Sequence, residues 1–217
     1  MAKRPAPGKT KTRLSTALSP QQAASLYACF LGDTLSLMRQ ASQAVADVQP
    51  AIAYAPATEK AYFTTLAPDF ELLLQKGNNL SERLAHISNY CFSQGYTRVV
   101  LMDSDSPTLP LDYLTTAFRA LNDKANVVLG PCDDGGYYLI GLNQPAPRLF
   151  LDVTMSTPTV AADTLAIAQS EGLQTDLLPT WYDVDDAASL QRLRQDVVNL
   201  DETQAVKTRE FLNQLDS

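Results

Sequence analysis

Short apolar runs that alternate with helical patterns constrain the fold of this chain more than any other feature of its sequence. The apolar runs have the length and composition of buried strands, and they occupy residues 51–54, 70–74, 98–102, 126–130, 137–142 and 173–178. Helical spacing of apolar residues predicts helices over residues 19–41, 58–66, 80–93, 110–121 and 157–171 and over most of 187–215. This alternation predicts an α/β fold with a mostly parallel sheet, in which the run RVVLM (98–102) is a central parallel strand.

The composition limits the classes of protein to which the chain can belong. With 217 residues, of which 45% are apolar and 19% charged, it has the size of one globular domain, which we expect to span residues 1–217. A net charge of −7 argues against a nucleic-acid-binding surface, and no apolar run is long enough to cross a membrane. The cysteines, Cys29, Cys91 and Cys132, are widely spaced and odd in number. This pattern argues against a disulfide framework and favours a location in the reducing cytoplasm.

Positive charge is concentrated at the start of the chain, in the stretch MAKRPAPGKTKTRL. Five of the seventeen Lys and Arg residues lie within the first thirteen positions. Lys9, Lys11 and Arg13 alternate after the flexible Gly8, and both residue types are good phosphate ligands. The stretch does not match the P-loop pattern, so it is either a binding loop for one small anion or a solvated basic tail.

Acidic residues stand where a ligand of an α/β sheet would lie, beyond the carboxyl end of a strand. Asp103 and Asp105 follow the run RVVLM directly, and this spacing suits Mg²⁺ or Mn²⁺ as well as it suits a turn into the next helix. Further along, the stretch WYDVDDAASL contains Asp183, Asp185 and Asp186. One of these carboxylates is expected to cap the following helix, and the others could complete a metal site.

The stretch PCDDGGYYLIGL places two glycines beside two acids. Gly135 and Gly136 would let the backbone approach a ligand closely, with Asp133 and Asp134 next to them. The same residues are typical of a hairpin turn, and the two interpretations are compatible.

Together, a basic loop and several acidic strand ends are what a metal-assisted reaction on a phosphorylated substrate requires. The single histidine, His86, lies in a helical pattern and is interpreted as a residue of the helix surface.

Five stretches, in this order, resemble a bacterial family of predicted transferases: KRPAPGKTKTRL, LMDSDSPTLP, GPCDDGGYYLIGL, LFLDVTMST and YDVDDAASL. That family belongs to the nucleotide-diphospho-sugar transferase (GT-A-like) superfamily and is often labelled as a glycosyltransferase of arsenosugar-type clusters. The chain is more distantly similar to phospholactate guanylyltransferase and to the molybdenum-cofactor nucleotidylyltransferases. The resemblance covers nearly the whole chain and implies one three-layer, Rossmann-like domain whose first strand is cut short in this sequence.

The resemblance also assigns roles to residues. It implies that a phosphate-binding loop is formed by Gly8, Lys9, Lys11 and Arg13, and that the donor site is lined by Asp134, Gly135 and Gly136. It implies Mg²⁺ or Mn²⁺ as cofactor, with Asp105 as the best ligand and with Asp183 and Asp185 as a second acidic element. Asp103 stands where relatives commonly have glycine. Asn79 and Ser81 also depart from the family's acidic D-L-G-E-R motif.

We expect a metal-dependent transferase that acts on a nucleotide or sugar-nucleotide donor. Glycosyl transfer is the first expectation, with Asp105, Lys11, Arg13 and Asp134 as catalytic residues. Nucleotidylyl transfer to a phosphorylated acceptor is the alternative, because a departing pyrophosphate needs the extra cations of the basic loop. A sugar-nucleotide-binding protein without turnover is the third.

In relatives an apolar strand runs into the motif K-x-P-x-P-G, and here only Met1 and Ala2 stand in that place. We therefore expect that the true start of the protein lies upstream of Met1, or that the sequence begins at an internal Met.

Overall fold

The computed structural model describes residues 1–215 and confirms the predicted α/β fold. The strands form two sheets. The first is parallel, with the order β1-β2-β3, and consists of β1 (Ala2–Lys3), β2 (Ala51–Ala55) and β3 (Glu71–Leu74). The second has the order β4-β6-β5-β7 and consists of β4 (Val99–Met102), β6 (Tyr137–Leu142), β5 (Val127–Pro131) and β7 (Thr175–Leu177).

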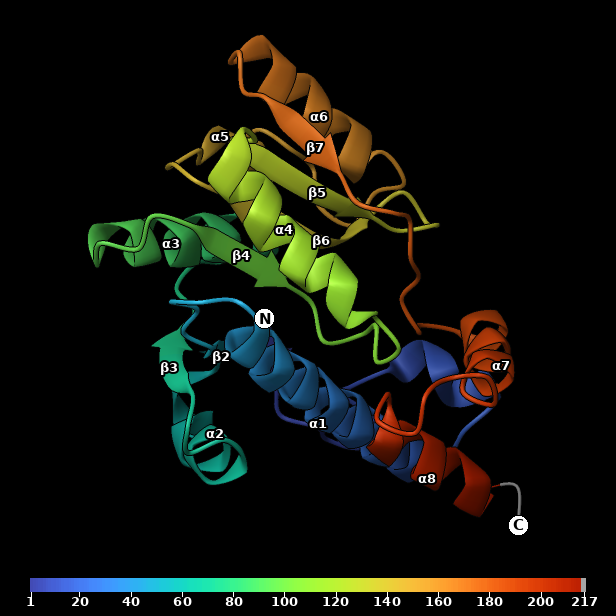
Figure 1. Ribbon diagram of the computed structural model, residues 1–217. Coiled ribbons are helices and arrows are strands. Elements are labelled where there is room, and N and C mark those ends of the chain that lie inside the picture. The colour runs from blue at the N-terminus through green and yellow to red at the C-terminus, as the bar shows by residue number, and fades with distance from the viewer. Residues whose placement is uncertain (216–217) are drawn as a thin grey trace.

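Helices cover both faces of these sheets (Figure 1). The helices are α1 (Pro20–Ala44), α2 (Lys60–Leu66), α3 (Leu80–Ser93), α4 (Leu111–Asp123), α5 (Arg148–Leu151), α6 (Val160–Ser170), α7 (Ala187–Asp196) and α8 (Val206–Leu215). Two 3-10 turns, η1 (Thr12–Thr16) and η2 (Ala57–Glu59), precede α1 and α2. Helices α1 and α4 pack against each other on one face, and α3, α5 and α6 form the layer on the other (Figure 1). Among the described residues, no helix is long and apolar enough to span a membrane.

The prediction that residues 98–102 form a central parallel strand is wrong in its pairing. Strand β4 pairs with β6 in antiparallel register, from Val99 opposite Leu142 to Met102 opposite Leu139. The physical reason is the tight turn after β5, which sends β6 back between β5 and β4 as the one reversed strand of the described chain. A strand that is covered on both faces is apolar throughout, so the sequence pattern does not distinguish the two pairings.

Helix α1 is the longest helix of the described chain, and Ser19 caps its start as predicted. The Ser19 side chain accepts a hydrogen bond from the backbone N–H of Gln22, and the Gln22 side chain accepts one from the backbone N–H of Ser19. This reciprocal capping, with Pro20 in the first turn, fixes where the helix starts. Near its middle, the buried Asp33 accepts hydrogen bonds from the backbone N–H groups of Lys207 and Thr208, at 3.0 and 2.9 Å, which holds the start of α8 against α1.

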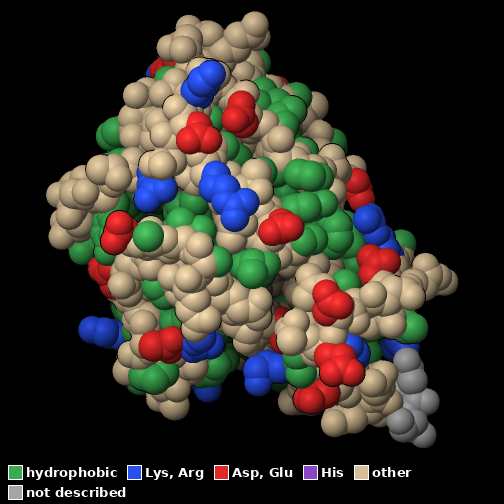
Figure 2. Space-filling model, viewed as in Figure 1, with side chains coloured by type: hydrophobic (Ala, Val, Ile, Leu, Met, Phe, Trp, Pro, Cys, Tyr) green, Lys and Arg blue, Asp and Glu red, His purple; other side chains and the backbone are tan. Residues whose placement is uncertain are grey.

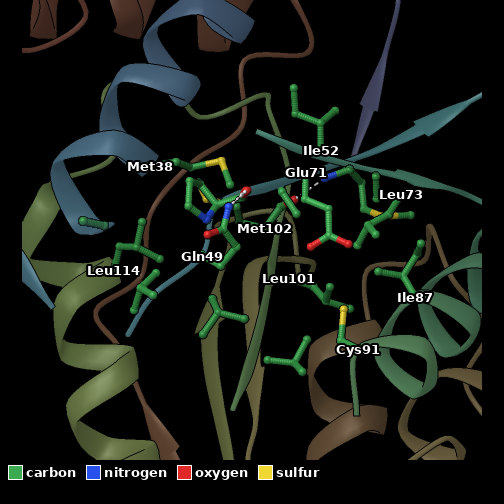
Figure 3. Close-up of a pocket in the computed structure, with 18 of the residues that line it drawn as sticks. Met38, Gln49, Ile52, Glu71, Leu73, Ile87, Cys91, Leu101, Met102 and Leu114 are labelled. Carbon is green, nitrogen blue, oxygen red and sulfur yellow. Dashed lines mark hydrogen bonds between the residues drawn. The ribbon is translucent and has the colours of Figure 1, made fainter. Parts of the chain in front are cut away.

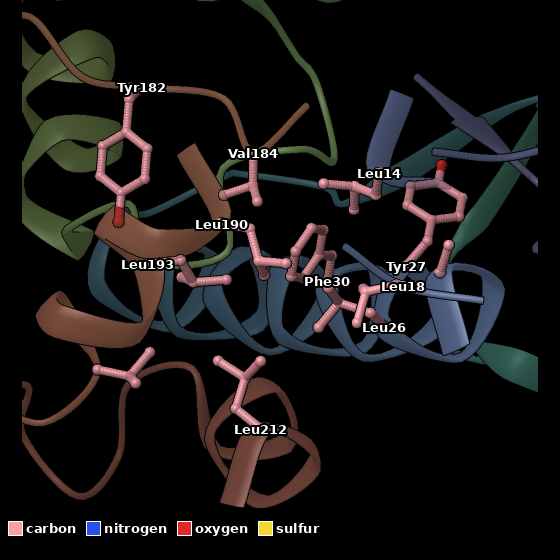
Figure 4. Packing of buried hydrophobic residues seen from close by; sticks show 12 residues of the cluster. Leu14, Leu18, Leu26, Tyr27, Phe30, Tyr182, Val184, Leu190, Leu193 and Leu212 are labelled. Carbon is pink, nitrogen blue, oxygen red and sulfur yellow. The ribbon is translucent and has the colours of Figure 1, made fainter. Parts of the chain in front are cut away.

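A buried cluster joins α1 to the loops at one end of the sheets (Figure 4). Tyr27 and Phe30 of α1 contact Leu14 of the N-terminal loop and Val184 of the segment before α7. All four side chains are buried, so two segments 170 residues apart share one core with α1. This cluster positions Arg13, which precedes Leu14, and Asp183 and Asp185, which flank Val184.

The predicted tail helix over 187–215 is interrupted in the structure. Helices α7 and α8 are separate, and residues 197–205 form a turn between them. The four-residue helix α5 was not predicted, because a segment of one turn has no helical periodicity to read.

The surface shown in Figure 2 has lysine and arginine side chains scattered among acidic ones, without a continuous basic patch on that face. The absence of a nucleic-acid partner, which the net charge suggests, stays a prediction.

The contact between Asp33 and α8 predicts a stability effect. Replacing Asp33 with Ala leaves two backbone N–H groups near the core without acceptors, which we expect to lower the free energy of unfolding by about 1–3 kcal/mol. Asp33→Asn keeps one acceptor oxygen and should cost less. Urea unfolding followed by circular dichroism measures both variants, and an Asp33→Ala protein as stable as the parent would contradict the assignment.

Candidate functional site

Four segments meet at the carboxyl ends of the strands to form the candidate site. They are the basic loop after β1 (4–16), the acidic loop after β4 (103–108), the turn between β5 and β6 (132–136) and the segment before α7 (181–186). Backbone hydrogen bonds connect them: the N–H of Val184 donates to the carbonyl of Asp105 at 2.9 Å, and the N–H of Asp133 donates to the carbonyl of Trp181 at 3.0 Å. The predicted convergence of the motifs is therefore present in the fold.

Lys11 points inward and joins two of the predicted acids. Its Nζ lies 2.7 Å from Oδ1 of Asp105 and 2.8 Å from Oδ1 of Asp185, and its side chain is only 4% exposed. The ammonium also lies 6.0 and 5.7 Å from the ring centroids of Tyr27 and Phe30. The interpretation of a solvated tail thus does not hold for Lys11, which is the fixed counterion of Asp105 and Asp185.

Electrostatics keep Lys11 charged in this position. Burial by itself would lower the pKa of the ammonium, but the charges of Asp105 and Asp185 and the hydrogen bonds to them more than offset it. The pKa of Lys11 therefore lies above its usual value.

Asp103 and Asp183 form a second acidic pair with a different environment. Oδ1 of Asp183 accepts hydrogen bonds from the hydroxyl of Ser106 at 2.8 Å and from the thiol of Cys132 at 3.3 Å. Oδ1 of Asp103 accepts one from the backbone N–H of Asp105 at 3.0 Å. Oδ2 of Asp103 is buried, and within residues 1–215 it has no hydrogen-bond partner.

This pair disfavours a negative charge on both carboxyl groups at once, and the carboxyl that is held protonated is that of Asp103. Burial raises the pKa of Asp103 well above its ordinary value, and the negative charges of Asp183 and Asp105 raise it further. Burial likewise raises the pKa of Asp183, although the hydrogen bonds from Asp103, Ser106 and Cys132 work against the rise. A cation at this point would relieve both effects.

The pair Asp103–Asp183 fits a divalent cation that shares its ligands with a substrate. The unpartnered oxygen of Asp103 is a free, buried, hard donor, and Mg²⁺ is commonly held by one or two carboxylates together with substrate phosphates and water. Within the described part of the chain, no group of three or more His, Cys, Asp or Glu side chains is arranged to hold a metal ion by itself. Of the four acids predicted as metal ligands, Asp105 and Asp185 are already paired with Lys11.

The turn 132–136 has the hairpin geometry that its sequence predicts. Oδ1 of Asp134 accepts a hydrogen bond from the N–H of Gly136 at 2.8 Å, and the N–H of Cys132 donates to the Gly136 carbonyl at 2.9 Å. Gly135 has a φ of +87°, and a Cβ atom there would lie 1.8 Å from the carbonyl oxygen of Pro158. The neighbouring loop thus already accounts for glycine at 135, and the donor-binding role of Asp134, Gly135 and Gly136 stays a prediction.

The basic loop is folded tightly and directs two cations to solvent. The hydroxyl of Thr10 donates to the Ala6 carbonyl and accepts from the Ala6 N–H. Gly8 has a φ of +70°, which favours glycine. Lys9 is exposed, and the Arg13 side chain is 75% exposed, 3.8 Å from Asp185. These two residues remain available to an anion beside the acidic pairs.

Arg192 is a residue of the site that sequence reasoning missed. Its guanidinium lies 3.8 Å from the ring centroid of Tyr182 and forms an ion pair with Asp133 of the turn. It lies in α7, where its polar neighbours gave it the pattern of an ordinary helix surface, so no local motif could have identified it.

Two other predicted features lie on α3. His86 lies on α3, is partly buried and stacks on Tyr90, and within the described residues its buried Nδ1 atom has no hydrogen-bond partner. Asn79, which departs from the family motif, caps α3 by accepting a hydrogen bond from the N–H of Glu82 at 2.9 Å. The residue that departs from the family motif at position 79 thus has a structural role, because it caps the start of α3.

Burial disfavours the charge of Asp103, whereas Lys11 stabilises the charge of Asp105. Replacing each of them with Asn should therefore change the stability of the protein in opposite directions. Because the pKa of Asp103 is raised on folding, its ionisation costs stability as the pH rises from about 4 through the folded-state pKa. At pH 7, Asp103→Asn should therefore stabilise the protein by about 1 kcal/mol, or roughly 2–4 °C in thermal midpoint, and the gain should shrink at acid pH.

Asp105→Asn is the matched control, because it removes one partner of the buried Lys11 ammonium and should lower the midpoint. Differential scanning calorimetry at pH 4 and pH 7 measures both variants. Shifts of the same sign at pH 7 would refute the division into two pairs.

Comparison with known proteins shows the family to which the chain belongs. The family model described as "Uncharacterized protein conserved in bacteria (DUF2064)" matches residues 34–157. A crystal structure from Desulfovibrio desulfuricans G20, described as a "putative nucleotide-diphospho-sugar transferase", is 32% identical, with a TM-score of 0.90 over 99% of this chain and 92% of that one. Among curated proteins, none matches the chain at a significant level.

More distant structures share the fold alone. A 4-diphosphocytidyl-2C-methyl-D-erythritol synthase is 13% identical, with a TM-score of 0.56 over 77% of this chain and 89% of that one. A CMP:2-keto-3-deoxy-manno-octonic acid synthetase in complex with CTP is 12% identical, with a TM-score of 0.53 over 78% and 88% of the respective chains. The chain belongs to the DUF2064 family of bacterial proteins and has the fold of the nucleotide-diphospho-sugar transferases.

Proposed function

We propose that this protein is a metal-dependent transferase that moves a sugar from a nucleotide-diphospho-sugar to an acceptor. The observation that carries the proposal is the buried pair Asp103–Asp183, with one unpartnered oxygen, beside two solvent-directed cations of the basic loop. The relative from Desulfovibrio desulfuricans G20, which shares 32% of the sequence over nearly the whole chain, is described by the same donor class and supports the choice of donor.

In this proposal the two acidic pairs have different tasks. Asp103 and Asp183 would hold Mg²⁺ or Mn²⁺, which supplies positive charge for the donor diphosphate and its departure. Lys11 holds Asp105 and Asp185 in place and neutralises them, so that they do not repel the diphosphate. Lys9 and Arg13 bind the phosphate oxygens that face solvent.

Transfer with inversion also requires a group that accepts the proton of the acceptor hydroxyl. In that step the acceptor oxygen bonds to the sugar carbon, the bond from that carbon to the phosphate oxygen breaks, and the nucleoside diphosphate leaves. We assign the proton-accepting role to Asp134, which is exposed at the turn and held there by its hydrogen bond to Gly136.

Nucleotidylyl transfer is the second candidate. It is favoured by the exposure of Lys9 and Arg13, because a departing pyrophosphate gathers more negative charge than a nucleoside diphosphate and needs additional cations that solvent can reach. A protein that only binds sugar nucleotides is the third candidate.

Product analysis separates the three candidates. The protein is supplied with Mg²⁺ or Mn²⁺, a panel of nucleoside triphosphates and sugar nucleotides, and mixed hydroxyl and phosphate acceptors. Release of nucleoside diphosphate from a sugar nucleotide is the expected result. Pyrophosphate release from a triphosphate without nucleoside diphosphate would replace the proposal with nucleotidylyl transfer, and binding without release would favour the third candidate.

Substitutions then test the residue roles. Asp103→Asn, Asp183→Asn and Asp105→Asn should each lower the rate of product release by about 100-fold or more, whereas His86→Ala should leave it near that of the parent. Because Asp103→Asn is expected to stabilise the fold, its loss of activity would not reflect unfolding. A fully active Asp103→Asn protein would refute the metal assignment.

Direct binding of Mn²⁺ gives a readout that does not depend on turnover. Titration followed by electron paramagnetic resonance should show Mn²⁺ binding to the parent and at least about 10-fold weaker binding to Asp183→Asn. Asp185→Asn is the control, because Asp185 is paired with Lys11 and should change Mn²⁺ affinity less. Equal losses in both variants would contradict the assignment of the cation to the Asp103–Asp183 pair.

A further inference from the structure

Arg192 of α7 contacts two parts of the candidate site at once. Its guanidinium forms an ion pair with Asp133, the neighbour of Asp134 in the turn between β5 and β6. The same group lies 3.8 Å from the ring centroid of Tyr182, the neighbour of Asp183. One side chain thus connects the turn that carries the proposed proton acceptor with the segment that carries a proposed metal ligand.

Tyr182 is a fixed support for this guanidinium. Its side chain is buried in the cluster that α1 shares with the segment before α7 (Figure 4). Its hydroxyl accepts a hydrogen bond from the Thr108 hydroxyl at 3.3 Å, and its carbonyl accepts one from the Ser106 hydroxyl at 3.0 Å. A guanidinium that stacks on a fixed ring has few orientations left, so Tyr182 limits the direction in which Arg192 donates.

The turn between β5 and β6 is attached to its surroundings on either side of its tip. The backbone N–H of Asp133 donates to the carbonyl of Trp181 at 3.0 Å, and the carbonyl of Gly135 accepts from the N–H of Ala161 at 3.0 Å. Asp134, between these two attachments, is exposed, and its carboxylate accepts a hydrogen bond from within the turn. The side chain of Asp133 is therefore the point at which α7 fixes the direction of the tip.

A cavity borders the start of the acidic loop. It has a volume of about 400 Å³, lies between β2 and β4, and is lined mainly by apolar side chains such as Leu101 and Leu114 (Figure 3). Asp103 and Ser104 also line it, so packing on that side does not hold the first residues of the loop tightly. The position of the loop relative to the turn therefore depends on the contacts that run through Tyr182.

We propose that Arg192 is a positioning residue, which acts through Asp133 and Tyr182 to set the position of Asp134 relative to the acidic pair that would hold the cation. The inference rests on the proposed function, in which Asp134 accepts the proton of the acceptor hydroxyl while the diphosphate departs beside the acidic pair. Both groups must act on one sugar carbon. A turn that moves by about 1 Å therefore lowers the rate even when the donor is still bound.

The expected effect is on the rate of transfer rather than on stability. The side chains of Arg192 and Asp133 are 45% and 54% exposed, and ion pairs that solvent reaches contribute little to the free energy of unfolding. Arg192→Met keeps an extended side chain over Tyr182 but removes the charge and the planar fork. It should lower kcat by about 10–100-fold and change KM for the donor by less than about 3-fold. The thermal midpoint should stay within about 2 °C of that of the parent.

Arg148→Met is the matched control. Arg148 is 56% exposed and likewise forms two ion pairs, with Asp152 and Glu171, but it lies on α5, outside the four segments of the candidate site. This variant should keep the kcat of the parent. Asp133→Asn should reproduce the loss seen in Arg192→Met, and the double variant should lose no more than either alone, because both changes break one contact. Arg192→Lys keeps the charge and should recover part of kcat.

Hydrogen exchange gives a readout that does not depend on turnover. In Arg192→Met, the amides of residues 133–136 should exchange at least about 10-fold faster than in the parent and in Arg148→Met, because the turn opens more often. A parent without turnover would contradict the proposed function, and the exchange comparison would still decide whether Arg192 holds the turn. Equal exchange in Arg192→Met and the parent, an unchanged kcat, or equal losses of kcat in Arg192→Met and Arg148→Met would each overturn the inference.

Discussion

The site depends on one ammonium group that holds three distant segments together. Lys11 lies after β1, Asp105 after β4 and Asp185 before α7, and a single Nζ atom lies within 2.8 Å of an oxygen of each carboxylate. The aromatic rings beneath it belong to α1, so the contact is anchored in the core that Leu14 and Val184 share. Breaking a buried pair of this kind leaves charges without partners, which makes the arrangement a structural requirement as well as a feature of the chemistry.

This ammonium also explains why the four neighbouring acids behave differently. Asp105 and Asp185 have the Lys11 ammonium as counterion, whereas the hydrogen bonds that Asp103 and Asp183 accept from Asp105, Ser106 and Cys132 come from neutral donors. The result is a strong local preference for a cation at Asp103 and a weak one at Asp105. The electrostatic imbalance is thus set by where Lys11 points, a property that depends on its backbone conformation at φ 50° and on the rings against which it packs.

Sequence patterns predicted features that depend on neighbouring residues, such as helix caps and turns. They did not predict features that depend on contacts between distant parts of the chain, such as strand pairing and ion pairs. The start of α1 at Ser19 and the turn at Gly135 follow from local chemistry that a sequence displays directly. The pairing of β6 with β4, the inward orientation of Lys11 and the contact of Arg192 with Asp133 each depend on a partner more than 30 residues away. Alternating cations in a loop look the same whether they face solvent or a buried carboxylate, so Lys9 and Lys11 could not be told apart before the fold was known.

The first strand, β1, determines where the basic loop of the candidate site lies. Strand β1 has two residues, and the basic loop follows it immediately, so the loop's position is set by how β1 lies between β2 and β4. The side chains of a binding site are held in precise positions only when the elements that carry them are rigid. The backbone from Met1 to Lys11 therefore links the sheets to the candidate site, and the position of β1 influences the direction from which Lys11 reaches Asp105 and Asp185.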